Sequence, residues 1–333
     1  MSAMLTHRAR LLIVAVAGIL LGPTARASDL LQLEAKIPLG EVSGRIDHMA
    51  IDLARGRLFV AELGNDSVGI VDLSARKMLR RLTGLKEPQG VGYIADADML
   101  YVANAGDGSV RAYRGADYAT AGRIDLGGDA DNIRVDPRTN RLLVGYGSGG
   151  VAVLDPAMQR KLADIALPAH PEAFQIDAGA NRVFINLPDA RAIAVADLDS
   201  ATPIAIWHNR GADGNFPMAL DLVAGRVLTV FRRPARLGVF AMRDGAPVAS
   251  VESCGDADDV FVDAKRKRIY VSCGDGHIDV FDAERNEYSR IAHIATVSGA
   301  RTSLFIPEMD RLLLAVRARG SEPAAIWIYR PAP

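Results

Sequence analysis

Motifs of common catalytic and cofactor-binding sites are missing from this sequence. It contains no GxSxG, HExxH or P-loop motif, and its two cysteines form neither a paired CxxC nor a CxxCH motif. These absences exclude a serine hydrolase elbow, an HExxH zinc site, a P-loop nucleotide site and a c-type haem site. Residues 145–150 match GxGxxG, but no helix pattern follows them, so the helix N-terminus that binds phosphate is missing.

An excess of either charge is also missing. The chain has 39 basic and 40 acidic residues, and 36 and 40 remain without residues 1–27, which hold three arginines and no acid. A weakly acidic surface favours neither nucleic acid nor a membrane surface as a partner. Aromatic residues make up only 6% of the chain, yet 49% of its residues are hydrophobic, which is enough for a large core.

Long apolar runs are absent beyond the N-terminal segment. Residues 11–21 form an apolar run of 11 residues, preceded by Arg8 and Arg10 and followed by Ala25-Arg26-Ala27. A membrane span needs about 20 residues, so this pattern predicts a cleavable signal peptide over residues 1–27. We expect a periplasmic or secreted mature chain that starts near Ser28, without membrane insertion and without a lipid anchor, because no lipobox cysteine is present.

A repeat of 41 to 44 residues is the strongest pattern in the sequence. Within each of seven units, apolar residues alternate with period two, which is typical of β-strands, and no sustained helical pattern appears. The first strands of the units end at Asp52, Ile94, Asp136, Asp177, Asp221, Asp263 and Ile306. Such an array predicts an all-β fold, a seven-bladed β-propeller with four-stranded antiparallel blades, as one domain over residues 28–333.

The two ends of the chain predict how the ring closes. The seventh unit stops after its third strand at Tyr329, whereas residues 31–39 form an additional strand before the first unit. We expect this N-terminal strand to complete the last blade, since it would cover an exposed ladder of backbone groups.

Two units carry the residues of a family resemblance. They contain Pro88-Gln89-Gly90-Val91 with Tyr101-Val102-Ala103-Asn104, and Tyr270-Val271-Ser272-Cys273 followed by Gly274-Asp275-Gly276. The chain thereby resembles the YVTN-repeat (NHL/YVTN-type) family of seven-bladed β-propellers over essentially residues 30–330. The resemblance implies the propeller fold. It leaves the function open, since the family and related propellers include binding modules, surface-layer proteins, lactonases and lyases.

Polar residues precede the seven inner strands, and in a propeller these positions lie on one rim, which we call the top face. Their side chains are predicted to line a funnel that receives a small molecule or a cation, although short Asp and Asn side chains also cap turns. The predicted ligand-binding residues are Asp47, His48, Gln89, Asp131, Asn132, His170, Glu172, Asn215, Asp258, Asp259 and Arg301.

A metal ion is the one cofactor that this rim suggests. Carboxylates suit hard divalent cations and imidazole suits zinc-like ions, so His48, Asp131, Glu172 and Asp258 are the candidate metal ligands. The loops after the second strands add polar residues to the same rim. These are an acidic and polar arc of Glu62, Asn65, Asp66, Asn104, Asp107, Tyr146, Asn186 and Asp189, and a basic arc of Arg232, Arg233, Arg236, Arg317 and Arg319. Either arc can simply be solvated surface, although arginines also match carboxylate and phosphate groups.

The cysteines Cys254 and Cys273 occur in parallel contexts, Ser-Cys-Gly-Asp, within the sixth unit. Export into an oxidising compartment favours a structural disulfide between them over a redox or metal-binding pair. The three histidines His208, His277 and His293 have no evident partner, and we interpret each as a surface or strand residue and not as a ligand.

Two functions follow as competing hypotheses. The first is a monomeric binding scaffold that presents its top face to a protein or a small molecule, since no nucleophile and base can be named. The second is a metal-assisted lyase or lactonase in the funnel with His48 or His170 as base, although these histidines belong to units that are not neighbours. A third, an accessory subunit of a redox system, has no support from any residue.

Overall fold

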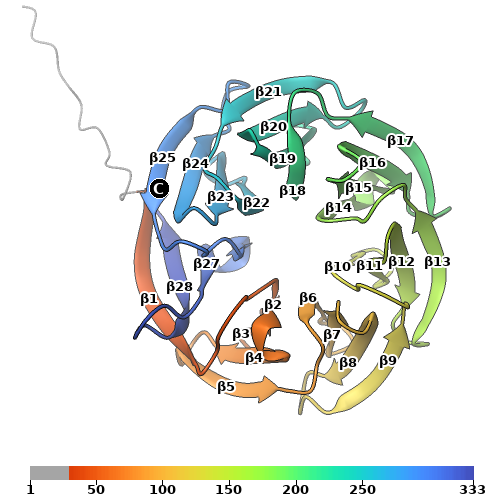
Figure 1. Ribbon diagram of the computed structural model, residues 1–333, viewed down its shortest axis with the longest axis vertical. Coiled ribbons are helices and arrows are strands. Elements are labelled where there is room, and N and C mark those ends of the chain that lie inside the picture. The colour runs from red at the N-terminus through yellow and green to blue at the C-terminus, as the bar shows by residue number, and fades with distance from the viewer. Residues whose placement is uncertain (1–29) are drawn as a thin grey trace, which may run out of the picture.

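The computed structural model describes residues 30–333, so the predicted signal peptide lies outside the described residues. Seven four-stranded antiparallel sheets stand around a central axis as the blades of a β-propeller (Figure 1). The predicted fold class is therefore confirmed. Among residues 30–333 no helix has the length and apolarity that a membrane crossing requires.

The first four blades follow the chain from the axis outwards. Blade 1 has β2 (Met49–Asp52), β3 (Arg57–Glu62), β4 (Ser67–Asp72) and β5 (Lys77–Leu82); blade 2 has β6 (Pro88–Ile94), β7 (Met99–Asn104), β8 (Ser109–Arg114) and β9 (Thr120–Asp125). Blade 3 has β10 (Ile133–Val135), β11 (Leu142–Tyr146), β12 (Gly150–Asp155) and β13 (Arg160–Ala166); blade 4 has β14 (Phe174–Asp177), β15 (Arg182–Leu187), β16 (Ala192–Asp197) and β17 (Thr202–His208).

The remaining blades complete the ring. Blade 5 has β18 (Asp213–Asp221), β19 (Arg226–Arg233), β20 (Ala235–Ala241) and β21 (Pro247–Glu252); blade 6 has β22 (Ala257–Asp263), β23 (Arg268–Cys273), β24 (His277–Asp282) and β25 (Arg290–Ala295). Blade 7 has β26 (Ser303–Ile306), β27 (Arg311–Val316), β28 (Ala324–Pro331) and, as its outer strand, β1 (Leu31–Gly40). The helical segments described are three 3₁₀ turns, η1 (Leu63–Asn65), η2 (Ala178–Ala180) and η3 (Pro307–Met309).

The N-terminal strand closes the ring as predicted. Strand β1 pairs antiparallel with β28, with Leu31 opposite Pro331 and Ile37 opposite Ile326. Strand β28 would otherwise present an unpaired row of backbone groups, which β1 now satisfies. The last blade thus combines both ends of the chain (Figure 1).

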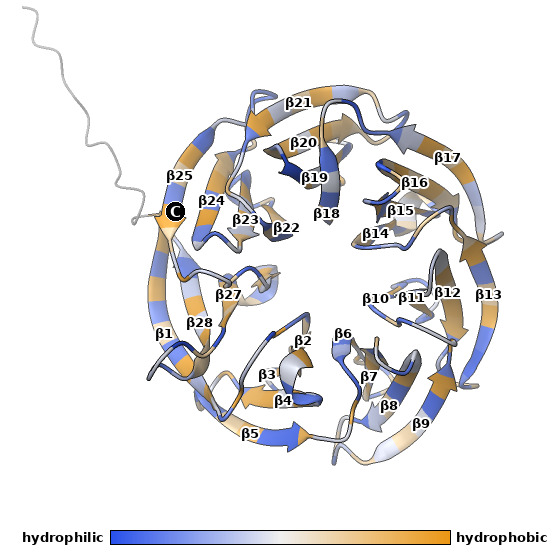
Figure 2. Ribbon diagram, viewed as in Figure 1, coloured by the Kyte–Doolittle hydropathy of each residue, from blue (hydrophilic) through white to orange (hydrophobic). Residues whose placement is uncertain are grey.

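The hydrophobic core lies between neighbouring blades. Second strands such as β3 and β27 are buried along almost their whole length, which explains their continuous apolar sequence. Phe59 of blade 1 packs with Val91 and Leu100 of blade 2, and this contact between blades recurs around the ring. Outer strands such as β5 and β9 mix hydrophilic and hydrophobic residues and are largely exposed or half-buried, because one of their faces meets solvent (Figure 2).

The acid that ends most inner strands has a local structural role. The Asp52 carboxylate accepts a hydrogen bond from the Arg55 N–H at 3.1 Å, and Asp221 accepts one from the Ala224 N–H at 2.9 Å. An aspartate side chain that binds backbone two or three residues ahead stabilises the turn into the next strand. These aspartates lie at the end of the inner strand that is opposite to the top face. Turn capping therefore accounts for the aspartate that ends most first strands.

Candidate functional site

Irregular pairing at the top of the inner strands places the rim residues. In blade 1 the Asp47 N–H donates to the Ala61 carbonyl at 2.7 Å, and the Ala61 N–H donates back to the His48 carbonyl at 3.0 Å. Two residues thus face one, as in a β-bulge, which re-aims side chains. The same pair of bonds joins Asp131 and Asn132 to Gly145, and Glu172 and Ala173 to Asn186. In blade 6 the register shift falls between Ala257 and Asp259, which leaves Asp258 as the additional residue.

These rim residues surround one small cavity on the axis, the funnel cavity. Its volume is about 20 Å³, which is enough for one water molecule or one ion. Most of the predicted set converges here, from blades far apart in sequence. The lining residues are Arg45, Asp47, His48, Gln89, Asp131, Asn132, Glu172, Ala173, Phe216 and Asp258.

Two carboxyl groups of the funnel cavity have raised pKa values. Burial is the main cause for both Asp47 and Glu172, and the nearby Asp131 carboxylate adds to it. The pKa of Glu172 rises to about 7. Arg45 lies 2.8 Å from the Asp47 carboxylate, whereas Glu172 forms no ion pair within residues 30–333. Glu172 therefore changes charge near neutral pH.

The Asp131 carboxylate has one paired and one unpaired oxygen. Its Oδ2 atom lies 3.8 Å from His170 Nε2, and contact with Asp131 is the main cause that raises the pKa of His170 to about 9. The Oδ1 atom is buried and has no hydrogen-bond partner among the described residues. A buried carboxylate oxygen without a partner loses its hydration without compensation. The Oδ1 atom can therefore bind a cation or accept a hydrogen bond from a ligand.

Both rim histidines, His48 and His170, interact electrostatically with the Asp131 carboxylate. Burial tends to lower the pKa of His48, but the carboxylates of Asp47, Asp259 and Asp131 outweigh burial and raise it. His170 contacts Asp131 from the linker that precedes blade 4. Blades 1 and 4 are not neighbours, as the sequence indicates, yet both histidines interact electrostatically with the Asp131 carboxylate of blade 3.

The opposite side of the funnel cavity is a closed ion-pair network. Arg232 donates to the Asp258 carboxylate at 2.6 Å, and Arg301 lies 3.1 Å from its other oxygen. Arg301 also donates to Asp256 at 2.7 Å, while the Arg232 guanidinium stacks 3.6 Å from the centre of the Phe216 ring. Asp258 and Arg301 therefore neutralise one another's charge.

A second cavity of about 400 Å³ follows the axis below the funnel cavity. His48 lines both spaces, so its ring lies between them. In the lower cavity, Asp259 accepts a hydrogen bond from the Ser303 N–H at 2.7 Å, and burial raises its pKa to about 7. Asp259 therefore belongs to the lower cavity and not to the lining of the funnel cavity.

Some predicted site residues have structural roles. Asn215 is fully buried and donates to Asn186 Oδ1 at 3.0 Å and to the Ala192 carbonyl at 2.9 Å, which joins blade 5 to blade 4. Asn132 lines the funnel cavity but its side-chain oxygen is already bonded to Arg134 at 2.8 Å. Both side chains therefore have structural partners, although these contacts are not the capping of local backbone amides that the sequence offered as an alternative.

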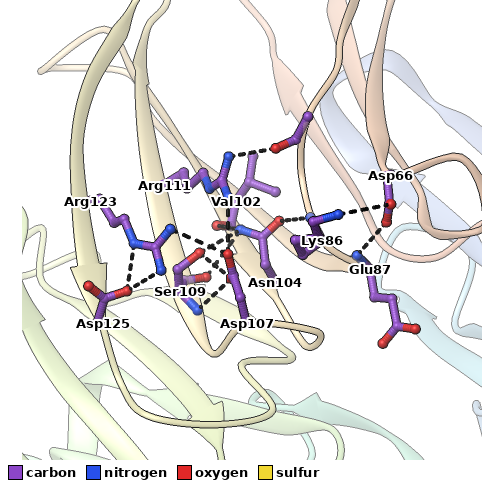
Figure 3. A network of polar contacts seen from close by, with 11 residues as sticks. Asp66, Lys86, Glu87, Val102, Asn104, Asp107, Ser109, Arg111, Arg123 and Asp125 are labelled. Carbon is purple, nitrogen blue, oxygen red and sulfur yellow. Dashed lines mark hydrogen bonds and ion pairs between the residues drawn. The ribbon is translucent and has the colours of Figure 1, made fainter.

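The residues of the acidic arc are largely engaged in local contacts. Figure 3 shows Asn104 and Asp107 in a network in which Asp107 accepts from Ser109 Oγ at 2.5 Å and from Arg111 at 3.0 Å. Glu62 likewise pairs with Arg81 at 2.6 Å. In the basic arc, Arg236 donates to Ser250 Oγ at 2.7 Å. The charges of Glu62 and Asp107 are thus compensated within their own blades, whereas Arg236 contacts neutral groups of Ser250. The acidic arc is therefore partly neutralised by basic residues of its own blades.

The four candidate metal ligands line or flank the funnel cavity without forming a closed coordination shell. Among residues 30–333, the group of three potential ligands whose atoms lie within 4.8 Å of one another is Cys254, Cys273 and Asp275. The metal interpretation of His48, Asp131, Glu172 and Asp258 stays a prediction. An ion here would complete its shell with water or with small side-chain movements.

The two cysteines of blade 6 form a disulfide, as predicted. It joins the linker before β22 to the end of β23, and both side chains are buried. The interpretation of two nearby histidines as residues without a partner was wrong. His277 contacts Asp275 at 3.1 Å and His293 contacts Asp279 at 2.6 Å. The pair of His277 and Asp275 is local, two residues apart in the chain, whereas the pair of His293 and Asp279 depends on the register between β24 and β25, which no periodicity in the sequence indicates.

Comparison with known proteins supports the fold and leaves the family open. No family model matches the chain, and no curated protein matches it. A solved chain titled Kuenenia stuttgartiensis hydrazine synthase is similar in structure, with a TM-score of 0.72 and 14% sequence identity, over 92% of this chain and 100% of that chain. At this identity the likeness shows the seven-bladed β-propeller fold alone.

Proposed function

We propose that this protein is an exported β-propeller of the YVTN type that binds a small cationic ligand or a divalent cation through its top face. The funnel cavity is the proposed site, with Asp131 and Glu172 as its principal ligands and Asp47 as a further carboxylate. In this view the blades act as a rigid scaffold that holds acids from separate blades around one point.

The unpaired Asp131 Oδ1 atom carries the proposal. It is buried, it has no partner among the described residues, and Asp131 lines a cavity the size of an ion. Glu172 lines the same cavity and forms no ion pair within residues 30–333. A cation would compensate both groups, whereas an anion would add repulsion.

Calcium, magnesium and zinc chlorides provide the first test, by calorimetry and thermal unfolding. One of them should bind with 1:1 stoichiometry, and a ligand at 100 times its Kd should stabilise the fold by about 2.7 kcal/mol. The double variant Asp131→Asn/Glu172→Gln should lose this response. The control Asp189→Asn, an exposed acid on the loop after β15, should keep it. Equal responses in both variants, or none in the wild type, would contradict the proposal.

A second candidate function is acid–base catalysis by a lyase or lactonase. A carboxyl group with a pKa of about 7 beside a histidine with a pKa of about 9 is suited to proton transfer at neutral pH. A panel of lactone and lyase substrates, with and without chelator, distinguishes this candidate. Turnover lost in Glu172→Gln supports catalysis, and inactivity under all conditions leaves the binding function.

Export is proposed from the N-terminal pattern of residues 1–27. The expected partner is a small molecule or a protein at the top face, and the expected state is a monomer. The intact mass of protein recovered from the periplasm or medium should correspond to a chain that begins near Ser28. An unprocessed mass would contradict this assignment.

A further inference from the structure

Two histidines of blade 6 stack on the outer half of the sheet. His277 begins β24, and His293 lies on β25 opposite Asp279, so the two histidines are diagonal neighbours on one face. Their ring centres are 3.9 Å apart with an angle of 17° between the planes. Both side chains reach solvent, with exposed fractions of 31% and 43%. The sheet therefore presents two parallel imidazoles at its surface.

Each ring has its own carboxylate at Nδ1. Asp275 lies 3.1 Å from Nδ1 of His277, and Asp279 lies 2.6 Å from Nδ1 of His293. A carboxylate at this atom favours the tautomer that carries its proton on Nδ1, which leaves the Nε2 lone pair free. Within residues 30–333, neither Nε2 atom has a hydrogen-bond or ion-pair partner.

The carboxylates themselves are held by backbone at the disulfide. Asp275 accepts a hydrogen bond from the Gly255 N–H at 2.7 Å, and Asp279 accepts one from the Cys254 N–H at 2.8 Å. Arg290 also donates to Asp279 at 3.1 Å, and the Asp279 side chain is fully buried. Both outer-shell groups are thus fixed before any ligand arrives.

This arrangement matches the chemistry of a metal-binding histidine. Ligating histidines commonly donate their second ring nitrogen to a carboxylate, which orients the ring and strengthens it as a ligand. Zinc binds imidazole nitrogen at about 2.0–2.1 Å, and imidazole also suits copper and nickel. The ring centres are 3.9 Å apart, and the terminal torsions of histidine are soft, so rotation about them can turn the two Nε2 lone pairs from parallel directions toward one ion.

We infer that His277 and His293 form a two-histidine site for a divalent transition metal, separate from the funnel cavity. Water completes the coordination shell on the solvent side, and Asp275 and Asp279 act as positioning residues. The site takes zinc, copper or nickel and rejects calcium and magnesium, which prefer oxygen ligands.

Zinc and nickel titrations of the tag-free full-length chain by calorimetry test this site. Saturating magnesium and the Asp131→Asn background remove any contribution of the funnel cavity. His277→Ala and His293→Ala should each weaken zinc binding at least tenfold, and Asp275→Asn should weaken it about 10–100-fold. His208→Ala, an exposed strand histidine without a carboxylate partner, is the matched control and should bind as the wild type does.

A spectroscopic readout separates ligation from a structural effect. Copper(II) bound to the wild type should show two nitrogen ligands by electron paramagnetic resonance, and one in each single histidine variant. Near-ultraviolet circular dichroism and the unreduced mass report whether each variant keeps its fold and its disulfide. Unchanged zinc affinity in the folded His277→Ala/His293→Ala double variant, or the same loss in His208→Ala, would overturn the inference.

Discussion

Glu172 carries a buried carboxyl group at the axis, and its pKa of about 7 stands well above its ordinary value. Burial is the main cause, and the Asp131 carboxylate adds to it. Between its ordinary pKa and about 7 the folded state holds a proton that the unfolded state has released. Glu172 therefore makes the fold less stable as pH rises through this range, and the loss is complete above it.

The variant Glu172→Gln should accordingly stabilise the protein at high pH. We expect a gain of about 1–3 kcal/mol at pH 8 and almost none at pH 4, because the glutamine carries no charge to desolvate. Chemical denaturation at both pH values, in the presence of chelator, measures the difference. The exposed control Asp189→Asn should show no such pH dependence, and a destabilised Glu172→Gln at pH 8 would contradict the assignment.

At the same scale, Gly90 controls how closely blade 2 approaches the Asp131 backbone. A Cβ atom at this position would lie 2.0 Å from the Asp131 carbonyl oxygen, so the backbone would have to move. We expect Gly90→Ala to cost about 1–3 kcal/mol and to weaken any cation binding in the funnel cavity. Gly128→Ala is the control, since nothing lies within 4 Å of its Cβ position. Equal unfolding free energies of the two variants would refute this role.

At the scale of elements, regular strand pairs and irregular strand pairs have different roles. Regular pairing of the inner and second strands builds each blade, and the bulges at the top of β2, β10 and β14 aim Asp47, Asp131 and Glu172 at the axis. The disulfide is also a link between elements, because it joins the linker before β22 to β23 across 19 positions of sequence.

Removal of this disulfide should lower stability without changing the fold. The double variant Cys254→Ala/Cys273→Ala should lose about 3 kcal/mol of unfolding free energy, since its unfolded chain is less constrained. Urea unfolding of the variant and of the oxidised wild type measures this loss. Two free thiols in the mass of unreduced, exported wild-type protein would argue against the bond itself.

At the scale of the whole molecule, stability depends on closure of the ring. Strand β1 pairs with β28 along its length, and Glu34 on β1 forms ion pairs with Arg311 and Arg330. Each blade buries its apolar faces only against its neighbours, so an open seventh blade exposes core on both sides of the gap.

Deletion of residues 29–40 should therefore destabilise the whole propeller. We expect loss of a single cooperative thermal transition, or a large decrease in Tm, measured by calorimetry. The variant Glu34→Gln keeps the backbone ladder and removes only the partly exposed ion pairs, so it should cost no more than about 1 kcal/mol. An unchanged Tm after the deletion would disprove this mechanism of closure.

The order of blades, the positions of the inner strands and the closure by residues 31–39 could be predicted from local information. Period-two alternation, turn residues and a fixed repeat length depend on residues close together in the chain, and they point to one architecture. The disulfide was also predictable, because two cysteines in parallel contexts fall within one blade.

The candidate site could be predicted only as a list of positions. Sequence order places both Asp131 and Asn215 in the rim, five and six residues before the ends of their first strands. In the fold, Asp131 Oδ1 lies without a partner among the described residues, whereas Asn215 is bonded between two blades. Likewise, the contact of His293 with Asp279 and the stacking of His293 on His277 follow from cross-strand register. The sequence by itself determined the blades and the rim, because these arise from short-range patterns. Only the tertiary structure decided which rim residues meet, since bulges, blade tilt and distances across the axis are set by packing between residues far apart in the chain.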